Sequence, residues 1–411
     1  MSVTPPSRAG SEPRFDPEAP SLVLAPHLAW PTRTGANLAI DRRWRAMSQF
    51  LPYVDLVGRE AIRRYAEGAV VSERSYANEE RSRIEAAART VLRRSHYLRE
   101  KFLTPDFVAQ AQAHLADSAY GTVLFSYLYT APLLEQDPSG RADRVYLIET
   151  HNDDFKWYRT LREATRNPLS KLTARLSEQA TVQLVQAYAD QALLLHVTEA
   201  DHQGYEPLAP GHRFFLNWVG VEIPEAPSPP QPPEDVVRLV FVGSLGVTMN
   251  VDALHHFAER FYPALKEGLG AQLAVDIVGS NPAEAVTQLC ETHGWALHAN
   301  VSDERLRDLY ASATFSILPF NYATGAKLKL LESLAHGVPF LATTKVEAQI
   351  DQVHPLCLLS DEPAGWLGRA RAVQADGLTE ETRAALVAVA EPHSWTARAR
   401  VLVEGLQQQF A

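Results

Sequence analysis

The residues best suited to bind a negatively charged ligand lie in the segment from Pro319 to Pro339. A short apolar run ends at Pro319, a polar loop with Gly325 follows, and a helix is expected to open with Lys327 and Lys329. Glycine lets a backbone approach a phosphate closely, and free N–H groups at a helix start attract anions. The pattern predicts a phosphate-binding loop. A solvated helix whose Lys and Glu side chains pair along its surface is the alternative.

Glu332 follows Gly325 by seven residues, which corresponds to about 10 Å along a helix axis. This separation fits the distance from a pyrophosphate to a ribose. A carboxylate can accept hydrogen bonds from the two ribose hydroxyls. The spacing therefore suggests that a nucleoside diphosphate binds here.

Alternating strands and helices position this segment in the second half of the chain. The alternation predicts right-handed crossovers and a parallel sheet covered on both faces, whose ligands bind beyond the carboxyl ends of the strands. The expected strands are Val236–Val242, Gln272–Val278, Trp295–His298, Thr314–Leu318, Pro339–Ala342 and Leu356–Leu359, and the expected helices are Val251–Lys266, Glu284–His293, Asp303–Ala311 and Lys327–His336.

The first half is expected to form a second α/β layer system, with a helical insertion at residues 75–118. The fold class expected is therefore α/β with two Rossmann-like domains. The expected strands are Ser21–Ala25, Tyr53–Val57, Thr122–Tyr127, Arg144–Thr150, Ala192–Val197 and Arg213–Leu216, and Ala36–Phe50 is the expected first helix.

Proline-rich stretches mark two boundaries. Residues 1–20 hold prolines among small polar residues, which predicts a disordered tail. The segment PEAPSPPQPPED, residues 224–235, predicts a stiff linker. We expect an N-terminal Rossmann-like domain at 21–223, a C-terminal one at 236–393 and a final helix at 394–411.

Composition limits the classes of partner and compartment. A length of 411 residues suits two domains, and a net charge of −10 argues against a broad basic surface for nucleic acid. Cys290 and Cys357 lie in apolar patterns without metal-ligand spacing, so we expect buried thiols in a reducing compartment. Since no signal-peptide pattern and no apolar run near 18 residues occurs, a cytoplasmic location is expected.

Four segments of the second half carry a family resemblance: FVGSLGVTMNVDAL (241–254), VDIVGSNP (275–282), ANVSDERLRDLYASATFSILPF (299–320) and TGAKLKLLESLAHGVPFLAT (324–343). They resemble the retaining glycosyltransferases of family 4, which have the GT-B fold. The resemblance implies two Rossmann-like domains that face each other across a cleft, with a nucleoside diphosphate sugar held mainly by the second domain and no further cofactor.

The sequence departs from the family pattern at two places. In family 4 enzymes two glutamates eight residues apart bracket the glycine loop, and the second binds the donor ribose. Glu332 matches the second, but Thr324 stands at the first, a pattern similar to a subgroup with a GxxxKxLE-like motif. Ser244 and Asn250 stand near the family's usual Arg and Lys. We expect Lys327 to bind the donor phosphate and to assist catalysis through its positive charge, with Lys329 as the second choice. The donor site that the resemblance implies comprises Gly243, Ser244, Asn300, Thr324, Gly325, Ala326, Lys327, Lys329, Leu330 and Glu332.

The first half resembles the family through APHLAWPTRTGANLAI (25–40) and LIETHNDDFKWYR (147–159). The first segment implies an acceptor-side loop at Arg33, Thr34 and Gly35, and an ordinary strand-to-helix turn at Gly35 is the alternative. The second places His151 just past a strand, where similar enzymes often have a catalytic His that reaches the donor sugar or phosphate. In the alternative, His151 is an incidental turn residue before a helix capped by Asn152 or Asp153.

Two further patterns have competing interpretations. Asp153 and Asp154 could bind a metal, as in the other large glycosyltransferase fold, but that fold has one main domain, so we expect no metal. The arginine-rich segment from Arg59 to Lys101 fits a solvated helix with i, i+4 ion pairs. Its alternative is a peripheral contact with the inner face of a membrane or with a lipid-linked acceptor.

The resulting prediction is an enzyme that transfers a sugar from a nucleoside diphosphate sugar to a hydroxyl acceptor, with retention, in glycan or glycoconjugate assembly. The acceptor would be a glycan, a lipid-linked molecule or a protein, and no nucleic-acid partner is expected. Two alternatives stay open. One is a non-catalytic nucleotide-sugar-binding partner subunit, favoured by the missing carboxylate at Thr324. The other is a sugar-nucleotide epimerase of the same fold.

Overall fold

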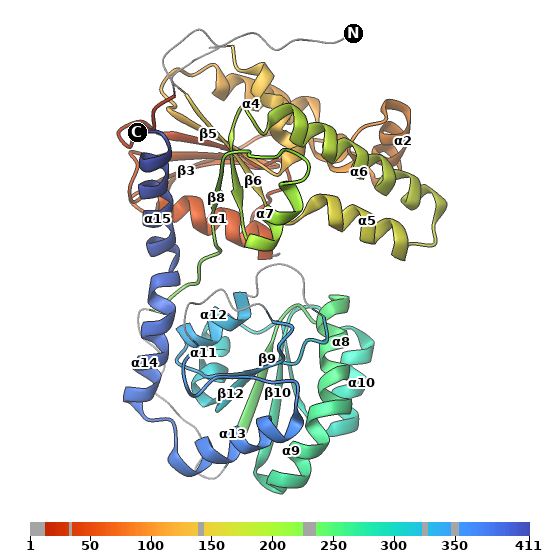
Figure 1. The fold of residues 1–411 in the computed structure, drawn as a ribbon, viewed down its shortest axis with the longest axis vertical. Coiled ribbons are helices and arrows are strands. Elements are labelled where there is room, and N and C mark those ends of the chain that lie inside the picture. Colours follow the sequence, from red (N-terminus) through yellow and green to blue (C-terminus); the bar gives the residue numbers. More distant parts are fainter. Residues whose placement is uncertain (1–12, 33–34, 139–143, 225–235, 323–327, 347–352) are drawn as a thin grey trace. The chain divides into compact units, whose positions relative to one another are not determined.

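The computed structural model describes residues 13–32, 35–138, 144–224, 236–322, 328–346 and 353–411. The chain forms two compact units (Figure 1). The N-terminal unit comprises residues 1–219 and 395–411, and the C-terminal unit comprises residues 220–394. Among the described residues, no helix combines the length and the apolar character needed to cross a membrane.

The N-terminal unit contains an eight-stranded sheet in the order β4-β3-β2-β1-β5-β6-β7-β8. Its strands are β1 Ser21–Leu24, β2 Val54–Val57, β3 Ala61–Ala66, β4 Ala69–Ser75, β5 Thr122–Ser126, β6 Val145–Thr150, β7 Leu193–His196 and β8 Phe214–Leu216. The pairs from β2 to β8 are all parallel, and β3 and β4 add antiparallel strands at one edge. Its helices are α1 Gly35–Met47, α2 Arg83–Arg93, α3 Tyr97–Phe102, α4 Pro105–Leu115, a 3₁₀ segment Leu128–Gln136, α5 Asp154–Ala164, α6 Pro168–Tyr188, α7 Glu199–Tyr205 and α15 Trp395–Gln409.

The β3–β4 hairpin corrects the expectation of a solvated helix in the first part of the Arg59–Lys101 segment, whereas α2, α3 and α4 confirm the helical insertion expected at 75–118. Its charges pair between strands: Arg63 donates to Glu73 at 2.7 Å, and the two residues are direct partners in the strand register. The turn is two residues long, and both Glu67 (φ 51°) and Gly68 (φ 76°) have positive φ, as a type I′ hairpin requires. An Arg/Glu-rich segment can therefore satisfy its charges across a sheet edge instead of along a helix.

The C-terminal unit contains a six-stranded parallel sheet in the order β11-β10-β9-β12-β13-β14. This is the Rossmann order, and its strand order reverses between β9 and β12. Its strands are β9 Val237–Val242, β10 Leu273–Gly279, β11 Ala296–Ala299, β12 Phe315–Leu318, β13 Phe340–Ala342 and β14 Leu358–Leu359. Its helices are α8 Thr248–His256, a π-helical turn Phe257–Phe261, α9 Tyr262–Leu269, α10 Glu284–His293, α11 Asp303–Ser312, α12 Leu328–Ala335, α13 Pro363–Asp376 and α14 Glu380–Ala390.

The unit boundaries differ slightly from the expected domains. Val221 forms a parallel bridge with Ser394, which places residues 220–223 in the C-terminal unit. The expected final helix is present as α15, which packs against α1 of the N-terminal unit. In the tail expected to be disordered, residues 13–20 are described and Phe15 is buried, whereas 1–12 lie outside the described residues. Most of the expected linker, 225–235, also lies outside them.

Candidate functional site

In the C-terminal unit, glycines bring the ends of β9 and β10 into close backbone contact. Gly243 donates its N–H to the carbonyl of Val278 at 2.9 Å. A Cβ on Gly279 would collide with the carbonyl oxygen of Gly243, so no larger residue fits there without movement. Leu245 donates to the Ser280 carbonyl at 2.8 Å. The loop after β9, which contains Ser244, is thus held against β10.

Lys329 places a positive charge beside this loop. Its Nζ donates to Asn250 Oδ1 at 2.7 Å, and Asn250 Nδ2 donates to the Ser244 carbonyl at 2.8 Å. The ammonium lies 4.6 Å from the ring centre of Phe241 and 5.3 Å from that of Phe320, which are attractive cation–π distances. These contacts fix a cation between β9 and β12, at the point where the strand order reverses.

Because Gly243 has no side chain, the ammonium group of Lys329 fits beside it. A Cβ there would collide with Lys329 Nζ. Asn250, the residue near the family's usual lysine, therefore contacts a lysine supplied by α12. Of the two lysines expected to face phosphate, only Lys329 is described. Thr324, Gly325, Ala326 and Lys327 lie outside the described residues.

The other predicted donor residues occupy three different environments. Asn300 adopts a left-handed conformation (φ 53°) after β11, and its Oδ1 accepts the N–H of Asn281 at 3.2 Å, so it shapes the loop after β10. Leu330 is 1% exposed and belongs to the hydrophobic core, so its side chain cannot contact a ligand without leaving that core. Glu332 is half-buried on α12. Burial raises the pKa of Tyr310 well above its usual range, and the nearby charge of Glu332 adds to this.

His151 of the N-terminal unit lies just past β6 with a side chain only 6% exposed. Its Nε2 lies 3.1 Å from Ser126 Oγ and 3.5 Å from Glu149 Oε2, and its ring centre is 4.2 Å from that of Tyr127. Burial, assisted by the charges of His27 and Arg43, holds the pKa of His151 well below its usual value. His151 is therefore a neutral, packed imidazole at pH 7. The N-cap of α5 is Asp153, whose side chain accepts the Lys156 N–H at 2.9 Å.

A buried ion pair lies beside His151. Arg43 from α1 pairs with Glu149 of β6, and both side chains are almost inaccessible to solvent. Arg43 also donates to the carbonyls of Asn217 and Trp218 at 3.1 and 3.2 Å. Burial, together with the charge of Arg398, lowers the pKa of Arg43 to about 9, so the guanidinium stays charged at neutral pH. This pair was not among the predicted site residues, although a glutamate inside the apolar run VYLIET was a usable signal.

His27, also absent from the predicted site, completes the N-terminal cluster. Its Nδ1 lies 3.0 Å from Tyr129 Oη and its ring centre 4.5 Å from that of Tyr127. Its Nε2 is buried without a hydrogen-bond partner in the described part of the chain. Tyr127 itself has φ 68°, an unusual conformation for a bulky residue that often marks a functional site. His27 follows β1 as His151 follows β6, so the same rule would have found it.

The remaining predictions, in both units, have mixed outcomes. Gly35 begins α1, and a Cβ there would meet no atom of the described residues within 4 Å, whereas Arg33 and Thr34 lie outside those residues. Asp154 is buried, and burial followed by the charges of Asp153 and Asp201 raises its pKa to about 7. Helix capping by Asp153 and burial of Asp154 account for this acidic pair. Cys290 and Cys357 are buried free thiols, as expected.

Comparison with known proteins shows a match between part of the C-terminal unit and a family model. Residues 236–376 match the family model described as "Glycosyl transferases group 1". No curated protein matches the sequence.

Solved structures match nearly the whole chain at low sequence identity. Sucrose-phosphate synthase from Thermosynechococcus elongatus has a TM-score of 0.62 and 15% identity, covering 96% of this chain and 99% of that one. The apo lipopolysaccharide outer core galactosyltransferase WaaB has a TM-score of 0.59 and 11% identity, covering 95% and 99%. The catalytic domain of starch synthase IV from Arabidopsis thaliana, bound to ADP and acarbose, has a TM-score of 0.58 and 12% identity, covering 95% and 99%. The chain has the two-domain GT-B fold, and within its C-terminal unit residues 236–376 are similar to group 1 glycosyltransferases.

Proposed function

We propose that this chain transfers a sugar from a nucleoside diphosphate sugar to a hydroxyl acceptor, with retention at the anomeric carbon. The observation that carries the proposal is the position of Lys329. Its ammonium is fixed by Asn250 and two aromatic rings at the point where the strand order of a Rossmann-like sheet reverses. Open α/β sheets bind ligands at this point, and the group 1 match covers the same unit.

The departing diphosphate needs a positive charge as the glycosidic bond breaks. Preorganised cations and dipoles aimed at such developing charge are a large term in catalysis. N–H groups at a helix start supply only about half a unit charge, so a lysine is needed beside them when no metal takes part. We infer that Lys329 supplies this charge and that Glu332, three residues further along α12, accepts the ribose hydroxyls.

The cluster around His151 suits recognition of a neutral sugar. Its neutral imidazoles and the Ser126 hydroxyl exchange hydrogen bonds without adding net charge, and the paired Arg43 and Glu149 offset each other's charge. We infer that His151 and His27 contact sugar hydroxyls during the reaction.

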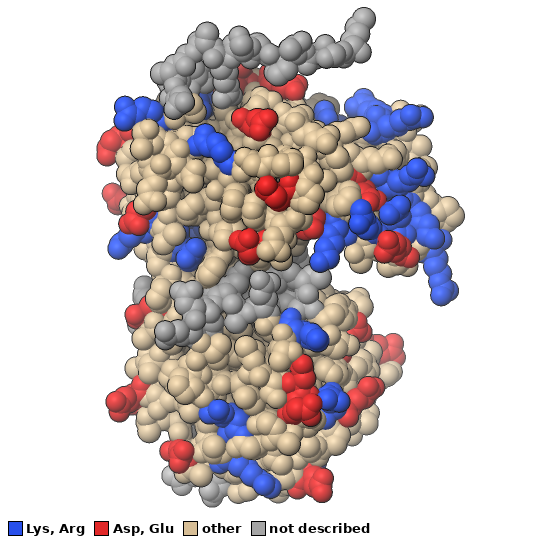
Figure 2. Space-filling view, viewed as in Figure 1, with Lys and Arg blue, Asp and Glu red and all other residues tan. Residues whose placement is uncertain are grey.

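The acceptor is proposed to be apolar or lipid-linked. A groove of about 720 Å³ lies between α2, α3, α5 and α6, with Ile84, Trp157 and Leu161 among its exposed apolar residues. Figure 2 shows Lys and Arg side chains gathered over the same helices. This combination favours an anionic membrane surface. The full chain should sediment with vesicles containing phosphatidylglycerol but not with neutral vesicles, and equal sedimentation with both would exclude the idea.

A nucleotide panel tests the function. UDP, GDP, ADP, dTDP and CMP are each compared with the corresponding nucleoside by thermal shift, because a ligand at 100 times its dissociation constant stabilises the native state by about 2.7 kcal/mol. We expect one diphosphate to stabilise the chain far more than its nucleoside does. The matching sugar donors are then tested for transfer or hydrolysis, with the anomer of the product identified by NMR. Binding without any turnover would favour the partner-subunit alternative.

A further inference from the structure

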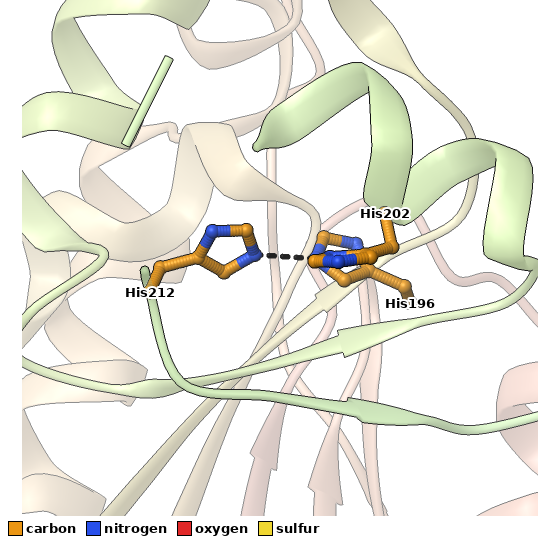
Figure 3. Close-up of side chains that lie close together, drawn as sticks. All are labelled: His196, His202 and His212. Atoms are coloured by element: carbon orange, nitrogen blue, oxygen red, sulfur yellow. Dashed lines mark hydrogen bonds between the residues drawn. The ribbon is translucent and has the colours of Figure 1, made fainter. Parts of the chain in front are cut away.

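Three histidines converge in the N-terminal unit away from His151. His196 ends β7, His202 lies on α7, and His212 precedes β8 (Figure 3). One ring nitrogen of each lies within 4.8 Å of the others, and the rings of His196 and His212 are buried. None of the three was a predicted site residue.

Hydrogen bonds define the tautomer of His212. Its Nδ1 lies 2.9 Å from the carbonyl oxygen of Ala209. A carbonyl can only accept, so Nδ1 must carry the hydrogen. In this tautomer the uncharged ring would present a lone pair on Nε2, which lies against His196.

His196 is oriented in a similar way. Its Nδ1 lies 2.8 Å from Thr150 Oγ1, and that hydroxyl donates its own hydrogen to the Leu195 carbonyl at 3.2 Å. In this arrangement Nδ1–H of His196 donates to Thr150, and its Nε2 also carries a lone pair. The two Nε2 atoms lie 3.0 Å apart. Two facing lone pairs repel each other unless a cation lies between them, or unless Thr150 turns its hydrogen toward His196.

The spacing fits a tetrahedral metal. Zn–N bonds of about 2.0–2.1 Å place two ligand nitrogens about 3.3 Å apart, so only a small ring movement is needed. His202 can supply the third ligand: its ring stacks on Phe214 with centres 3.6 Å apart, and its Nδ1 is buried without a partner among the described residues. Metal-bound imidazoles usually donate their other N–H to a carbonyl or another oxygen, as His212 and His196 do to Ala209 and Thr150.

We propose that His196, His202 and His212 form a binding site for a divalent transition metal of the zinc class, with the fourth position left to water. Imidazole ligands favour such ions over Mg²⁺ or Ca²⁺, which prefer oxygen. The ion would tie α7 and the segment before β8 to β7. Asp201 of α7 accepts the Asp153 N–H at 2.9 Å, so the site would also stiffen the loop that carries His151.

Metal binding by the full chain, expressed without a polyhistidine tag and stripped with chelator, tests the proposal. We expect one equivalent of Zn²⁺ by calorimetry, a higher melting temperature with Zn²⁺, and d–d absorption of bound Co²⁺ typical of four-coordinate nitrogen ligation. His202→Ala should weaken binding at least ~100-fold, since even loss of an outer-shell partner costs 10–100-fold. The matched control His114→Ala, on α4 of the same unit, should bind as wild type.

Thr150→Val keeps all three imidazoles and should weaken binding ~10–100-fold. The metal titration of the wild-type chain tests the site directly, so its result does not depend on whether a variant folds. Absence of stoichiometric Zn²⁺ and Co²⁺ binding by the wild-type chain would overturn the site and leave the Thr150-to-His196 hydrogen bond as the explanation. Zinc binding by His202→Ala at wild-type affinity would also overturn it.

Discussion

The two units carry different chemistry at the carboxyl ends of their parallel strands. In the C-terminal unit the described cation, Lys329, lies beside glycine-rich backbone. In the N-terminal unit the corresponding edge holds neutral, buried imidazoles beside an ion pair that cancels its own charge. The first arrangement suits an anionic ligand and the second a neutral polyhydroxyl ligand. Two sheets of one architecture can thus be specialised by a few side chains at one edge.

The largest expected effect is on the ion pair that keeps the N-terminal edge neutral. Glu149→Gln leaves Arg43 charged and buried without its partner, which should cost about 3–5 kcal/mol in free energy of unfolding, measured by urea denaturation. Arg43→Met with Glu149→Leu removes both charges and should recover part of that loss. If the single and double variants are equally unstable, packing and not charge explains the effect.

His151→Ala tests whether the neutral edge takes part in turnover. A contact that strengthens in the transition state should lower kcat ~100-fold while nucleotide affinity changes little. Steady-state kinetics and calorimetry separate the two quantities, and His114→Ala, on α4 of the same unit, serves as the control. Wild-type kcat with a reduced melting temperature would show that His151 is only a packed turn residue.

Acid should destabilise the N-terminal unit more than the C-terminal unit. Burial first, and then the charges of Arg59 and Arg99, lower the pKa of His27 and His96 to about 3, whereas burial lowers that of His336 to about 4. Since these folded-state values lie below the unfolded value of 6.5, their stabilisation is complete above pH 6.5 and is lost as pH falls toward them.

At pH 5.5, His27 and His96 together should cost about 2–3 kcal/mol and His336 about half as much, and His151 adds to the loss in the N-terminal unit. Hydrogen exchange of peptides from β1 and β5, compared with β9 and β12, measures the two units separately. Equal loss of protection in both units would contradict the assignment, and His96→Gln should reduce the acid sensitivity of the N-terminal unit.

Lys329→Ala tests the cationic edge. Loss of a charge-assisted contact of about 1.5–3 kcal/mol should weaken binding of the nucleoside diphosphate ~10–100-fold and leave the nucleoside nearly unchanged. Lys266→Ala, on α9 of the same unit, is the control. A parallel loss for both ligands would mean that Lys329 supports the fold without contacting phosphate.

Glu332→Gln should have the smallest effect, a ~10-fold weaker affinity for both nucleoside and diphosphate, since both contain the ribose. A 2′,3′-dideoxy nucleotide should lose affinity for the wild-type chain but not for the variant. The ribose assignment fails if the variant still discriminates between the two sugars.

Local patterns predicted most of the fold. Every expected strand of the C-terminal sheet is present within two residues of its expected start, because short β-branched runs alternate with amphipathic helices there. The β3–β4 hairpin was missed because its charges resemble a solvated helix. Its Glu67–Gly68 turn is also a weaker signal than Asn-Gly or Asp-Gly.

The sequence by itself determined the α/β class, the helix that carries Lys329 and the position of His151 past a strand, because each depends on neighbours within one helix or strand. Tertiary structure decided which side chains meet. Lys329 joins Asn250 from 79 positions away, and Arg43 joins Glu149 across the same unit. The three histidines meet only because β7, α7 and the approach to β8 fold together. Such pairs follow from strand order and packing direction, which local propensity does not encode.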